Sequence, residues 1–185
     1  GIHYAFISGN HISWDGKAAL HKTLDVVNKF AREHNGFFRY DDLAAYLEQL
    51  GIRTGNLRGQ MRLGNAPYFF YYSVGELLSA ESMEIGEAWL DQAEKALNRL
   101  FADVGDHIVL RSINPIWYEQ LPALPGHRPW TPLLLQYMLQ FYGKRLAAKT
   151  IGAELTQRYD ILHAMLVSWD SEVQTFADAV IAYLV

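Results

Sequence analysis

Four of the six prolines in this chain of 185 residues fall between Asn114 and Trp130. Proline fixes one backbone dihedral and has no backbone N–H to donate, so neither a helix interior nor a central strand can run through such a segment. We therefore expect residues 114–131 to form an irregular connection that separates two structured halves.

Hydrophobic periodicity predicts the elements of the first half. Leu24, Val27 and Ala31 recur at helical spacing, and Asn35-Gly36 follows as a stop signal. The expected elements are a helix over Asp15–His34, an extended link at Phe37–Arg39, a helix within Tyr40–Ile52 that Gly51 ends, a short helix over Thr54–Leu63 and a strand over Tyr68–Val74.

The second half is predicted to be mostly helical, because long amphipathic patterns dominate it. The expected elements are helices over Met83–Asp103, Pro132–Tyr142, Lys149–Tyr159 and Glu172–Leu184, a strand over His107–Ile113, and a segment over Asp160–Trp169 that fits a strand or a helix. This content predicts a mainly α fold with a few short β-strands.

The elements from residue 24 to residue 74 run helix, helix, tight turn at Gly51-Ile52, helix and strand. This order resembles the winged-helix superfamily of helix-turn-helix proteins. The resemblance implies a winged-helix-like unit over residues 1–80, packed on a helical unit over residues 132–185, with a connecting helix and strand over residues 81–113 and the proline-rich connection between them.

The second unit is a candidate for a diverged copy of the first, a second winged helix. Leu43–Leu47 (LAAYL) and Ile151–Leu155 (IGAEL) each follow a helix and a glycine at similar spacing. Chance similarity between two amphipathic helix pairs is the alternative.

Charge is divided unevenly between the halves, although the whole chain has a net charge of -4. Residues 1–80 hold eight basic and seven acidic residues, a balance of +1, whereas residues 81–185 hold eight and thirteen, a balance of -5. A site for a polyanion is therefore expected to be a local patch in the first half.

The segment after Gly51 is the candidate patch, because Arg58 and Arg62 lie one helical turn apart and arginine pairs with phosphates and guanine edges. The family prevalently binds DNA, so the resemblance implies a nucleic-acid-binding regulator or accessory protein. The candidate nucleic-acid-binding residues are Arg53, Asn56, Arg58, Gln60 and Arg62, with Lys29, Arg32 and Arg39 as further contacts. Many winged helices bind only protein, so a protein–protein adaptor is the alternative function. For the arginines themselves, the alternative is an ordinary helix face exposed to solvent.

Five aromatic residues in succession, Tyr68–Tyr72, place rings on both faces of the predicted strand. Such a strand is typical of a hydrophobic core. A platform on which nucleic-acid bases stack is the functional alternative.

Other chemistries have little support in the sequence. The chain has no cysteine, which excludes disulfides, thiolate metal sites and cysteine nucleophiles. Its seven histidines are not paired at helical spacing, and neither a phosphate-binding glycine loop nor a G-x-S-x-G motif occurs. We therefore expect no metal, no cofactor and no catalytic residue; an enzyme whose reaction no motif names remains the alternative.

Partners and location are predicted from residue types. No apolar run approaches the roughly 20 residues that span a bilayer, so no membrane partner is expected, and we expect a cytoplasmic protein. Trp117, Tyr118 and Trp130 are of the types that dominate protein interfaces, so the proline-rich connection is a candidate partner surface, with cover for the seam between the halves as the alternative. Self-association through the acidic second half is a further expectation, and the absence of an initial Met is compatible with a piece of a longer protein.

Overall fold

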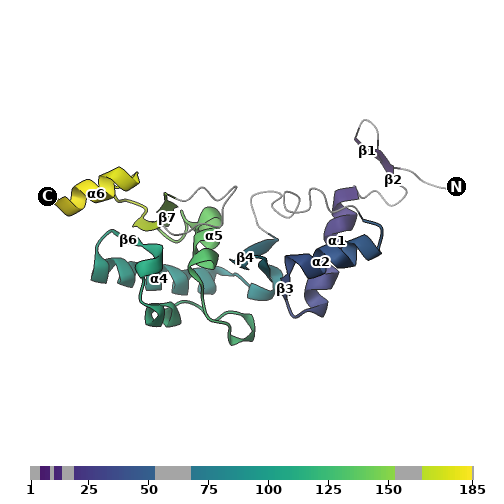
Figure 1. The fold of residues 1–185 in the computed structure, drawn as a ribbon, viewed down its shortest axis with the longest axis horizontal. Helices are drawn as coiled ribbons and strands as arrows, with labels where there is room; N and C mark the ends of the chain where they lie inside the picture. The colour runs from purple at the N-terminus through teal and green to yellow at the C-terminus, as the bar shows by residue number, and fades with distance from the viewer. Residues whose placement is uncertain (1–4, 9–10, 14–18, 53–67, 153–163, 185) are drawn as a thin grey trace.

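The computed structural model describes residues 5–8, 11–13, 19–52, 68–152 and 164–184. The helices are α1 (Ala19–Glu33), α2 (Tyr40–Gln49), α4 (Glu87–Val104), α5 (Pro132–Tyr142) and α6 (Phe176–Leu184). The strands are β1 (Ala5–Ser8), β2 (His11–Ser13), β3 (Phe37–Arg39), β4 (Phe69–Ser73), β5 (Glu76–Ser79), β6 (His107–Val109), β7 (Ala148–Ile151) and β8 (Met165–Ser168). The arrangement is elongated, with the β1–β2 hairpin near one end and α6 at the other (Figure 1).

The strands form one two-stranded hairpin and two three-stranded antiparallel sheets, so the fold mixes helix and strand. The expectations of a mainly α fold and of a helical second unit are therefore wrong. Part of the error lies at the start of the helix expected over Lys149–Tyr159, because Lys149–Ile151 belong to β7, which pairs with β8. Ala and Lys favour helices in isolation, but pairing with a neighbouring strand overrides such local preferences.

The first sheet has the strand order β3-β5-β4. Leu78 of β5 stands opposite Phe37 on one side and Phe70 on the other, so the last strand in sequence is the central strand in space. Arg39 ends β3 and α2 begins at the next residue, where Asp41 and Asp42 occupy the first turn. Acidic side chains are favourable there because the helix dipole is positive at that end.

Glycine determines the turn between α1 and β3. Asn35 and Gly36 both have positive φ, and the Gly36 N–H donates to the Ala31 carbonyl at 2.8 Å, which closes the helix. The helix predicted over Asp15–His34 is confirmed for the described part, and its inward stripe, Leu24, Val27 and Ala31, is buried.

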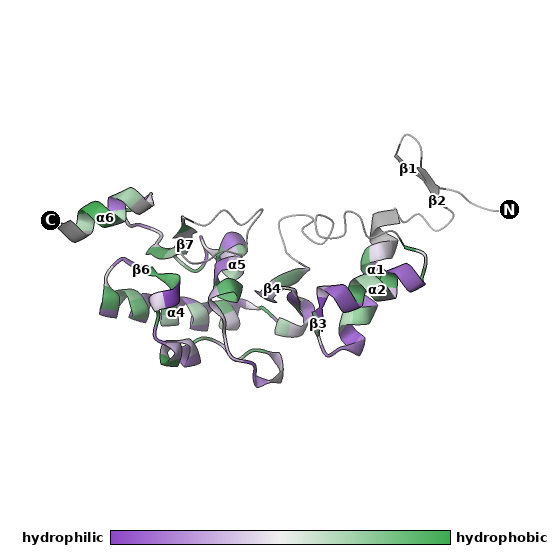
Figure 2. Cartoon of the chain, viewed as in Figure 1, coloured by the Kyte–Doolittle hydropathy of each residue, from purple (hydrophilic) through white to green (hydrophobic). Residues whose placement is uncertain are grey.

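The second sheet has the strand order β6-β8-β7, so again the last strand is central. Met165 of β8 pairs with Val109 of β6 and with Ile151 of β7. The helix α4 precedes this sheet and shows hydrophobic and hydrophilic bands along its length (Figure 2). Its buried residues are Leu90, Ala93, Ala96, Leu97 and Leu100.

The connection from Leu110 to Thr131 contains three short 3-10 turns, η2 (Leu110–Ser112), η3 (Pro115–Gln120) and η4 (Pro125–His127), besides the earlier turn η1 (Glu81–Met83). Asn114 caps η3 by accepting a hydrogen bond from the Ile116 N–H at 3.1 Å. The expectation of an irregular segment with no long helix or strand is confirmed.

The helices α1, α2, α4 and α5 share one hydrophobic core with the two sheets, whereas Met165, Val167, Val173 and Ala179 form a second, smaller cluster between β8 and α6. The helix α5 packs against β4, an edge strand of the first sheet. Tyr71 of β4 lies 4.8 Å from Tyr137 of α5 between ring centroids, and the Phe70 ring meets Phe141 edge to face at 6.2 Å. Phe69, Phe70 and Tyr71 are buried, so the core role predicted for the aromatic run is confirmed for these three.

Candidate functional site

Five of the eight predicted nucleic-acid-binding residues, Arg53, Asn56, Arg58, Gln60 and Arg62, lie outside the described residues. The chain on each side of them is described. Before the segment, the Ile52 N–H donates to the Leu47 carbonyl at 2.9 Å and closes α2; after it, the Tyr68 carbonyl accepts from the Ala80 N–H at 3.0 Å. The basic segment thus connects the end of α2 to the edge strand β4.

Lys29, Arg32 and Arg39 are the three predicted contact residues that the structure describes, and all three are exposed. The Lys29 ammonium lies 3.8 Å from Glu33, and the Arg32 guanidinium lies 3.9 Å from Glu81. Pairs between exposed side chains contribute little free energy, so these cations can exchange their carboxylate for another anion at small cost.

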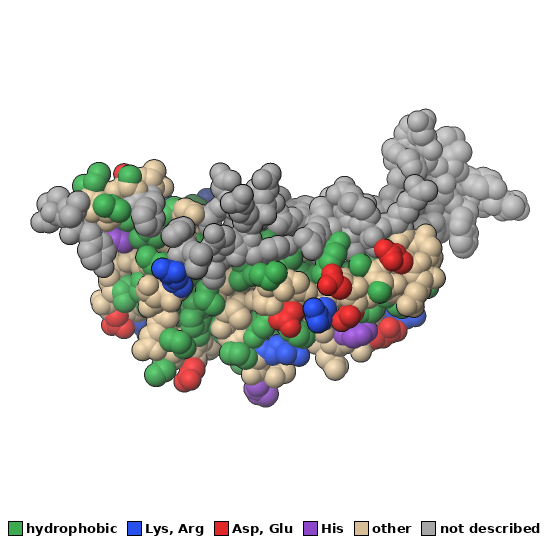
Figure 3. Space-filling view, viewed as in Figure 1, with side chains coloured by type: hydrophobic (Ala, Val, Ile, Leu, Met, Phe, Trp, Pro, Cys, Tyr) green, Lys and Arg blue, Asp and Glu red, His purple; other side chains and the backbone are tan. Residues whose placement is uncertain are grey.

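Acidic side chains share the same surface. Asp41, Asp42 and Glu48 of α2 are exposed close in sequence to Arg39. Figure 3 shows acidic and basic side chains interspersed over this end of the molecule. The described surface of the first unit is therefore mixed in sign, which limits the electrostatic attraction that it offers to a polyanion.

In the second unit, the helix before the last two strands is α5, and it is buried. Seven consecutive residues, from Leu133 to Leu139, are inaccessible to solvent or nearly so, and they include Gln136. The face of α5 that would otherwise be open lies against β4 of the first unit. The second unit cannot present this helix to a ligand without separating from the first.

The aromatic residues of the proline-rich connection are also buried. Trp117 is 6% exposed, Tyr118 8% and Trp130 9%, and all three belong to the common core. The Trp130 indole donates to the Pro122 carbonyl at 2.8 Å, which ties the two ends of a short loop together. Their positions agree with the interpretation that they cover the seam between the halves.

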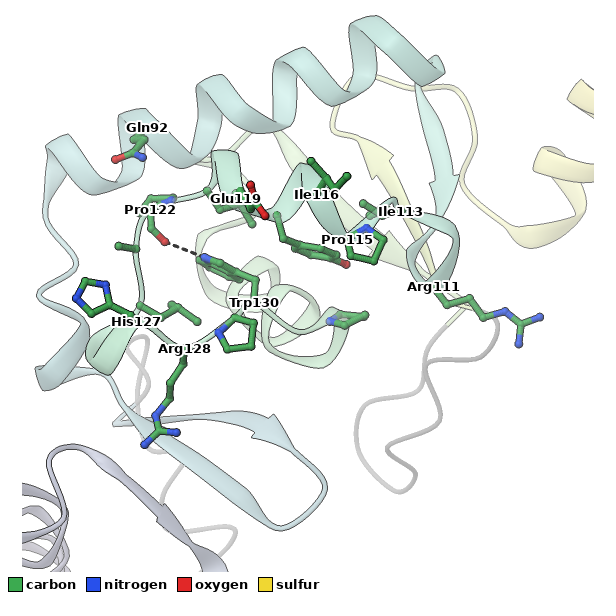
Figure 4. A pocket seen from close by; sticks show the side chains of 16 residues that line it. Gln92, Arg111, Ile113, Pro115, Ile116, Glu119, Pro122, His127, Arg128 and Trp130 are labelled. Carbon is green, nitrogen blue, oxygen red and sulfur yellow. Dashed lines mark hydrogen bonds between the residues drawn. The ribbon is translucent and has the colours of Figure 1, made fainter.

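A cavity of about 740 Å³ opens beside this connection. Its lining combines apolar side chains of the connection, such as Ile113 and Leu124, with Gln92 of α4 and Pro132 at the start of α5. Figure 4 shows Trp130 in the middle of the lining, with Arg111 and Arg128 extending beyond it in different directions. The sequence analysis did not predict this cavity.

Arg128 also connects the cavity to the first sheet. Its guanidinium carbon lies 3.6 Å from the centroid of the Phe37 ring. A cation stacked on an aromatic face keeps its in-plane N–H groups directed outward, where they can donate to a carboxylate or phosphate.

Asp106, His107 and Ser171 form a polar cluster at the start of β6. One Asp106 oxygen lies 2.6 Å from His107 Nδ1, and the other accepts the Ser171 hydroxyl at 2.5 Å. The hydrogen bond from Ser171, followed by that from His107, holds the pKa of Asp106 below its ordinary value. The Ser171 hydroxyl donates to Asp106 and not to His107, so the histidine is not placed to take the serine proton and the cluster does not form an activated nucleophile. The hydrogen bonds of the cluster join the start of β6 to the turn after β8.

In the described part of the chain, no three His, Asp or Glu side chains gather in a geometry that could hold a metal ion. Among the described helices, none has the length and apolar character required to cross a membrane. Comparison of the chain with protein-family models, with curated proteins and with solved structures finds no match.

Proposed function

We propose that this chain is a non-enzymatic regulator or accessory protein that contacts duplex nucleic acid through a winged-helix-like first unit, and that it acts in the cytoplasm. The contacts come from the basic segment after α2 together with Lys29, Arg32 and Arg39. Arg53 and Arg62 contact phosphates, while Asn56, Arg58 and Gln60 approach base edges.

The shared plan of the two units supports this proposal. In the first unit a helix, a strand and a second helix precede a two-stranded hairpin, and in the second unit α4, β6 and α5 precede β7 and β8. In both sheets the last strand lies between the other two. The winged-helix resemblance, inferred from element order alone, is thus supported by strand order in both units.

The observation that carries the proposal is the charge of the segment between α2 and the first sheet's edge strand β4. Residues 53–67 contain three arginines and no acid. In the second unit only residues 143–147 separate α5 from β7. The long connection in the first unit is therefore a local concentration of positive charge in a chain of net negative charge, and such a segment can pair with an anion.

Binding of a fluorescently labelled 20-base-pair duplex of mixed sequence, measured by anisotropy at 50 mM and 200 mM salt, tests the proposal. We expect Arg58→Ala and Arg62→Ala each to weaken binding several-fold and to make the salt slope shallower, since each removes one positive charge from the contact with the duplex. Arg99→Ala, which removes an exposed arginine of α4, is the matched control and should leave both quantities unchanged. Absence of duplex binding, or binding that ignores both substitutions, would refute the proposal.

A protein–protein adaptor that retains the same fold is the second candidate. The observation that favours it is the mixed sign of the first unit's described surface, with Asp41, Asp42 and Glu48 close to the cations. An adaptor predicts no duplex binding at either salt concentration.

A further inference from the structure

The second sheet has hydrophobic residues on both of its faces. On β8, Leu166 belongs to the main core, whereas Met165 and Val167 on either side of it belong to the smaller cluster with Val173 and Ala179. Successive side chains of a strand point to opposite faces of its sheet, so the main core covers one face and the smaller cluster covers the other. We call this second face the outer face of the sheet, and its hydrophobic residues are Val109, Ile151, Met165 and Val167.

The helix α6, which lies at one end of the molecule, covers the outer face with few of its described side chains (Figure 1). Among residues 177–182, whose side chains the structure describes, Ala179 is the only buried one, and Val180 and Ile181 are exposed. Val173, in the turn before the helix, is 6% exposed and completes the cluster. A region that buries few apolar side chains opens at a lower cost in free energy than a central core does.

Hydrogen bonds hold the turn before α6 against the sheet, and we call them the clasp. The Ser171 hydroxyl donates to Asp106, which precedes β6, at 2.5 Å and accepts the Val173 N–H at 3.0 Å. The Gln174 side chain accepts a hydrogen bond from the Lys149 ammonium of β7 at 3.0 Å and donates to the Ser171 carbonyl at 2.8 Å. Ser171 is buried, so the bond from Ser171 to Asp106 is the shielded part of the clasp.

The start of α6 is fixed by residues of its own segment. The Thr175 hydroxyl accepts the Asp178 N–H at 3.2 Å, and the Asp178 carboxylate accepts the Thr175 N–H at 2.7 Å and the Gln174 N–H at 3.0 Å. This reciprocal pair is a capping box, and it uses no group of the sheet. The helix start therefore does not depend on contact with the outer face.

We propose that α6 is a hinged lid over the outer face of the second sheet. The lid opens when the clasp breaks, and residues 169–174, between β8 and α6, supply the hinge. The main core stays folded when the lid opens, because it holds β8 through Leu166 and includes none of the α6 side chains that the structure describes. The chain therefore has a closed state that hides Met165 and Val167 and an open state that exposes them. The lid belongs to the second unit and does not depend on the function proposed for the first.

Thiol labelling tests the lid cleanly, because the chain has no cysteine. Val167→Cys places a thiol on the outer face, and Leu166→Cys places one in the main core at the next residue of the same strand; both side chains are fully buried. We expect N-ethylmaleimide to label the Val167→Cys protein at least about tenfold faster than the Leu166→Cys protein, because a local opening is more populated than global unfolding. Equal labelling rates for the two proteins would overturn the proposal.

A destabilised main core separates local opening from global unfolding. Leu97→Val, at a buried residue of α4 that belongs to the main core, should speed labelling of the Leu166→Cys protein and leave that of the Val167→Cys protein unchanged. If it speeds both by the same factor, the outer face is reached only by global unfolding, and the proposal is overturned.

Hydrogen exchange of the unsubstituted chain gives a measurement that does not depend on whether either cysteine variant folds. The amides of α6 should exchange at least about tenfold faster than those of α4, while those of β8 remain protected. Protection of α6 equal to that of α4 would overturn the proposal.

The clasp has its own test in the Val167→Cys protein. Ser171→Ala removes the bond to Asp106 and should speed labelling several-fold, whereas Ser112→Ala, at an exposed serine of η2 outside the clasp, is the matched control and should not change it. Unchanged labelling of the Ser171→Ala variant would overturn the assignment of the clasp as the group of bonds that keeps the lid closed.

Discussion

The hydroxyl of Thr131 donates to the backbone carbonyl of Tyr72 over 2.5 Å, and this bond joins the first residue before α5 to the edge strand of the first sheet. The same hydroxyl accepts the Leu134 N–H at 3.1 Å and so caps the helix. A second bond runs from the Tyr72 hydroxyl to the Pro129 carbonyl at 2.8 Å. Two residues 59 positions apart therefore set both the start of α5 and its position against β4.

Thr131→Val is expected to lower the free energy of unfolding by about 1–2 kcal/mol, because it removes a helix cap and a hydrogen bond between the units while keeping the size of the side chain. Thr131→Ser retains the hydroxyl and should cost less than half as much. Urea unfolding followed by circular dichroism measures both. A loss for Thr131→Val no larger than that for Thr131→Ser would show that the hydroxyl contributes no more than the methyl group, and would contradict the role assigned to its two hydrogen bonds.

Gly36→Ala is expected to destabilise the chain more than Gly75→Ala. Both glycines have positive φ, +74° and +81°, so each substitution incurs the backbone cost of about 1 kcal/mol. A Cβ at residue 36 would also lie 2.3 Å from the side chain of Ser82, whereas a Cβ at residue 75 meets nothing within 4 Å. The overlap should add about 1–3 kcal/mol.

Thermal unfolding of the two glycine variants measures this difference directly. Ser82→Gly in the Gly36→Ala background should recover the part that comes from overlap, and it should leave the backbone cost in place. A Gly36→Ala protein that unfolds together with Gly75→Ala would contradict the close approach of η1 to the α1–β3 turn.

Arg145 holds the turn after α5 against α4, and its removal should destabilise the chain in a salt-dependent way. Its guanidinium bonds to Glu94 at 2.7 Å and to Glu87 at 3.2 Å, and it also bonds to Asp91. These three acids lie along one face of α4, so Arg145→Gln leaves like charges beside one another.

We therefore expect Arg145→Gln to lower the urea midpoint at 20 mM salt and to recover part of the loss at 500 mM, where repulsion is screened. Lys144→Gln, at the neighbouring exposed position, is the matched control and should change the midpoint little. A loss of equal size at both salt concentrations would mean that Arg145 acts through packing of its alkyl chain.

Some elements could be predicted because their signals are local. Pro132 and Gly143 bound α5 in the sequence, and the structure places the helix over Pro132–Tyr142. The Asn35-Gly36 stop after α1 is likewise local, because the positive φ values that end the helix suit those residue types.

The strand β4 lies within the strand predicted over Tyr68–Val74, but β5 and β7 could not be predicted in the same way, because their identity depends on partners distant in sequence. Glu76–Ser79 contains two leucines and a glutamate, a composition that suits a helix, yet it is the central strand of the first sheet. In the proposed repeat, Leu43–Leu47 lies in α2, whereas Ile151 ends β7 and residues 153–155 lie outside the described part of the chain. The two units correspond in strand order instead.

The candidate sites likewise combine features that are local in the sequence with features that depend on tertiary contacts. The basic character of the segment after Gly51 is visible in the sequence, and so is the concentration of Trp, Tyr and Arg in the connection. The pairing of Arg32 with Glu81, the stacking of Arg128 on Phe37 and the burial of Trp117 depend on tertiary contacts that no local pattern reports.

The Asp106 cluster predicts how stability depends on pH. The pKa of Asp106 is lowered in the folded chain, first by the hydroxyl of Ser171 and then by His107, so near the ordinary aspartate pKa of 3.8 the folded chain binds fewer protons there than the unfolded chain. The stability that Asp106 contributes is present above pH 3.8 and is lost as the pH falls through the lower pKa of the folded state.

Asp106→Asn should abolish this part of the loss. Because half of the side chain is exposed, we expect the variant to be less stable by under about 1 kcal/mol at neutral pH, with the two stability curves converging toward pH 3. Urea midpoints collected from pH 7 to pH 3 measure the convergence, and Asp103→Asn, in an exposed aspartate at the end of α4, is the control. Parallel curves for the wild type and Asp106→Asn would show that the hydrogen bonds from Ser171 and His107 do not favour the charged carboxylate.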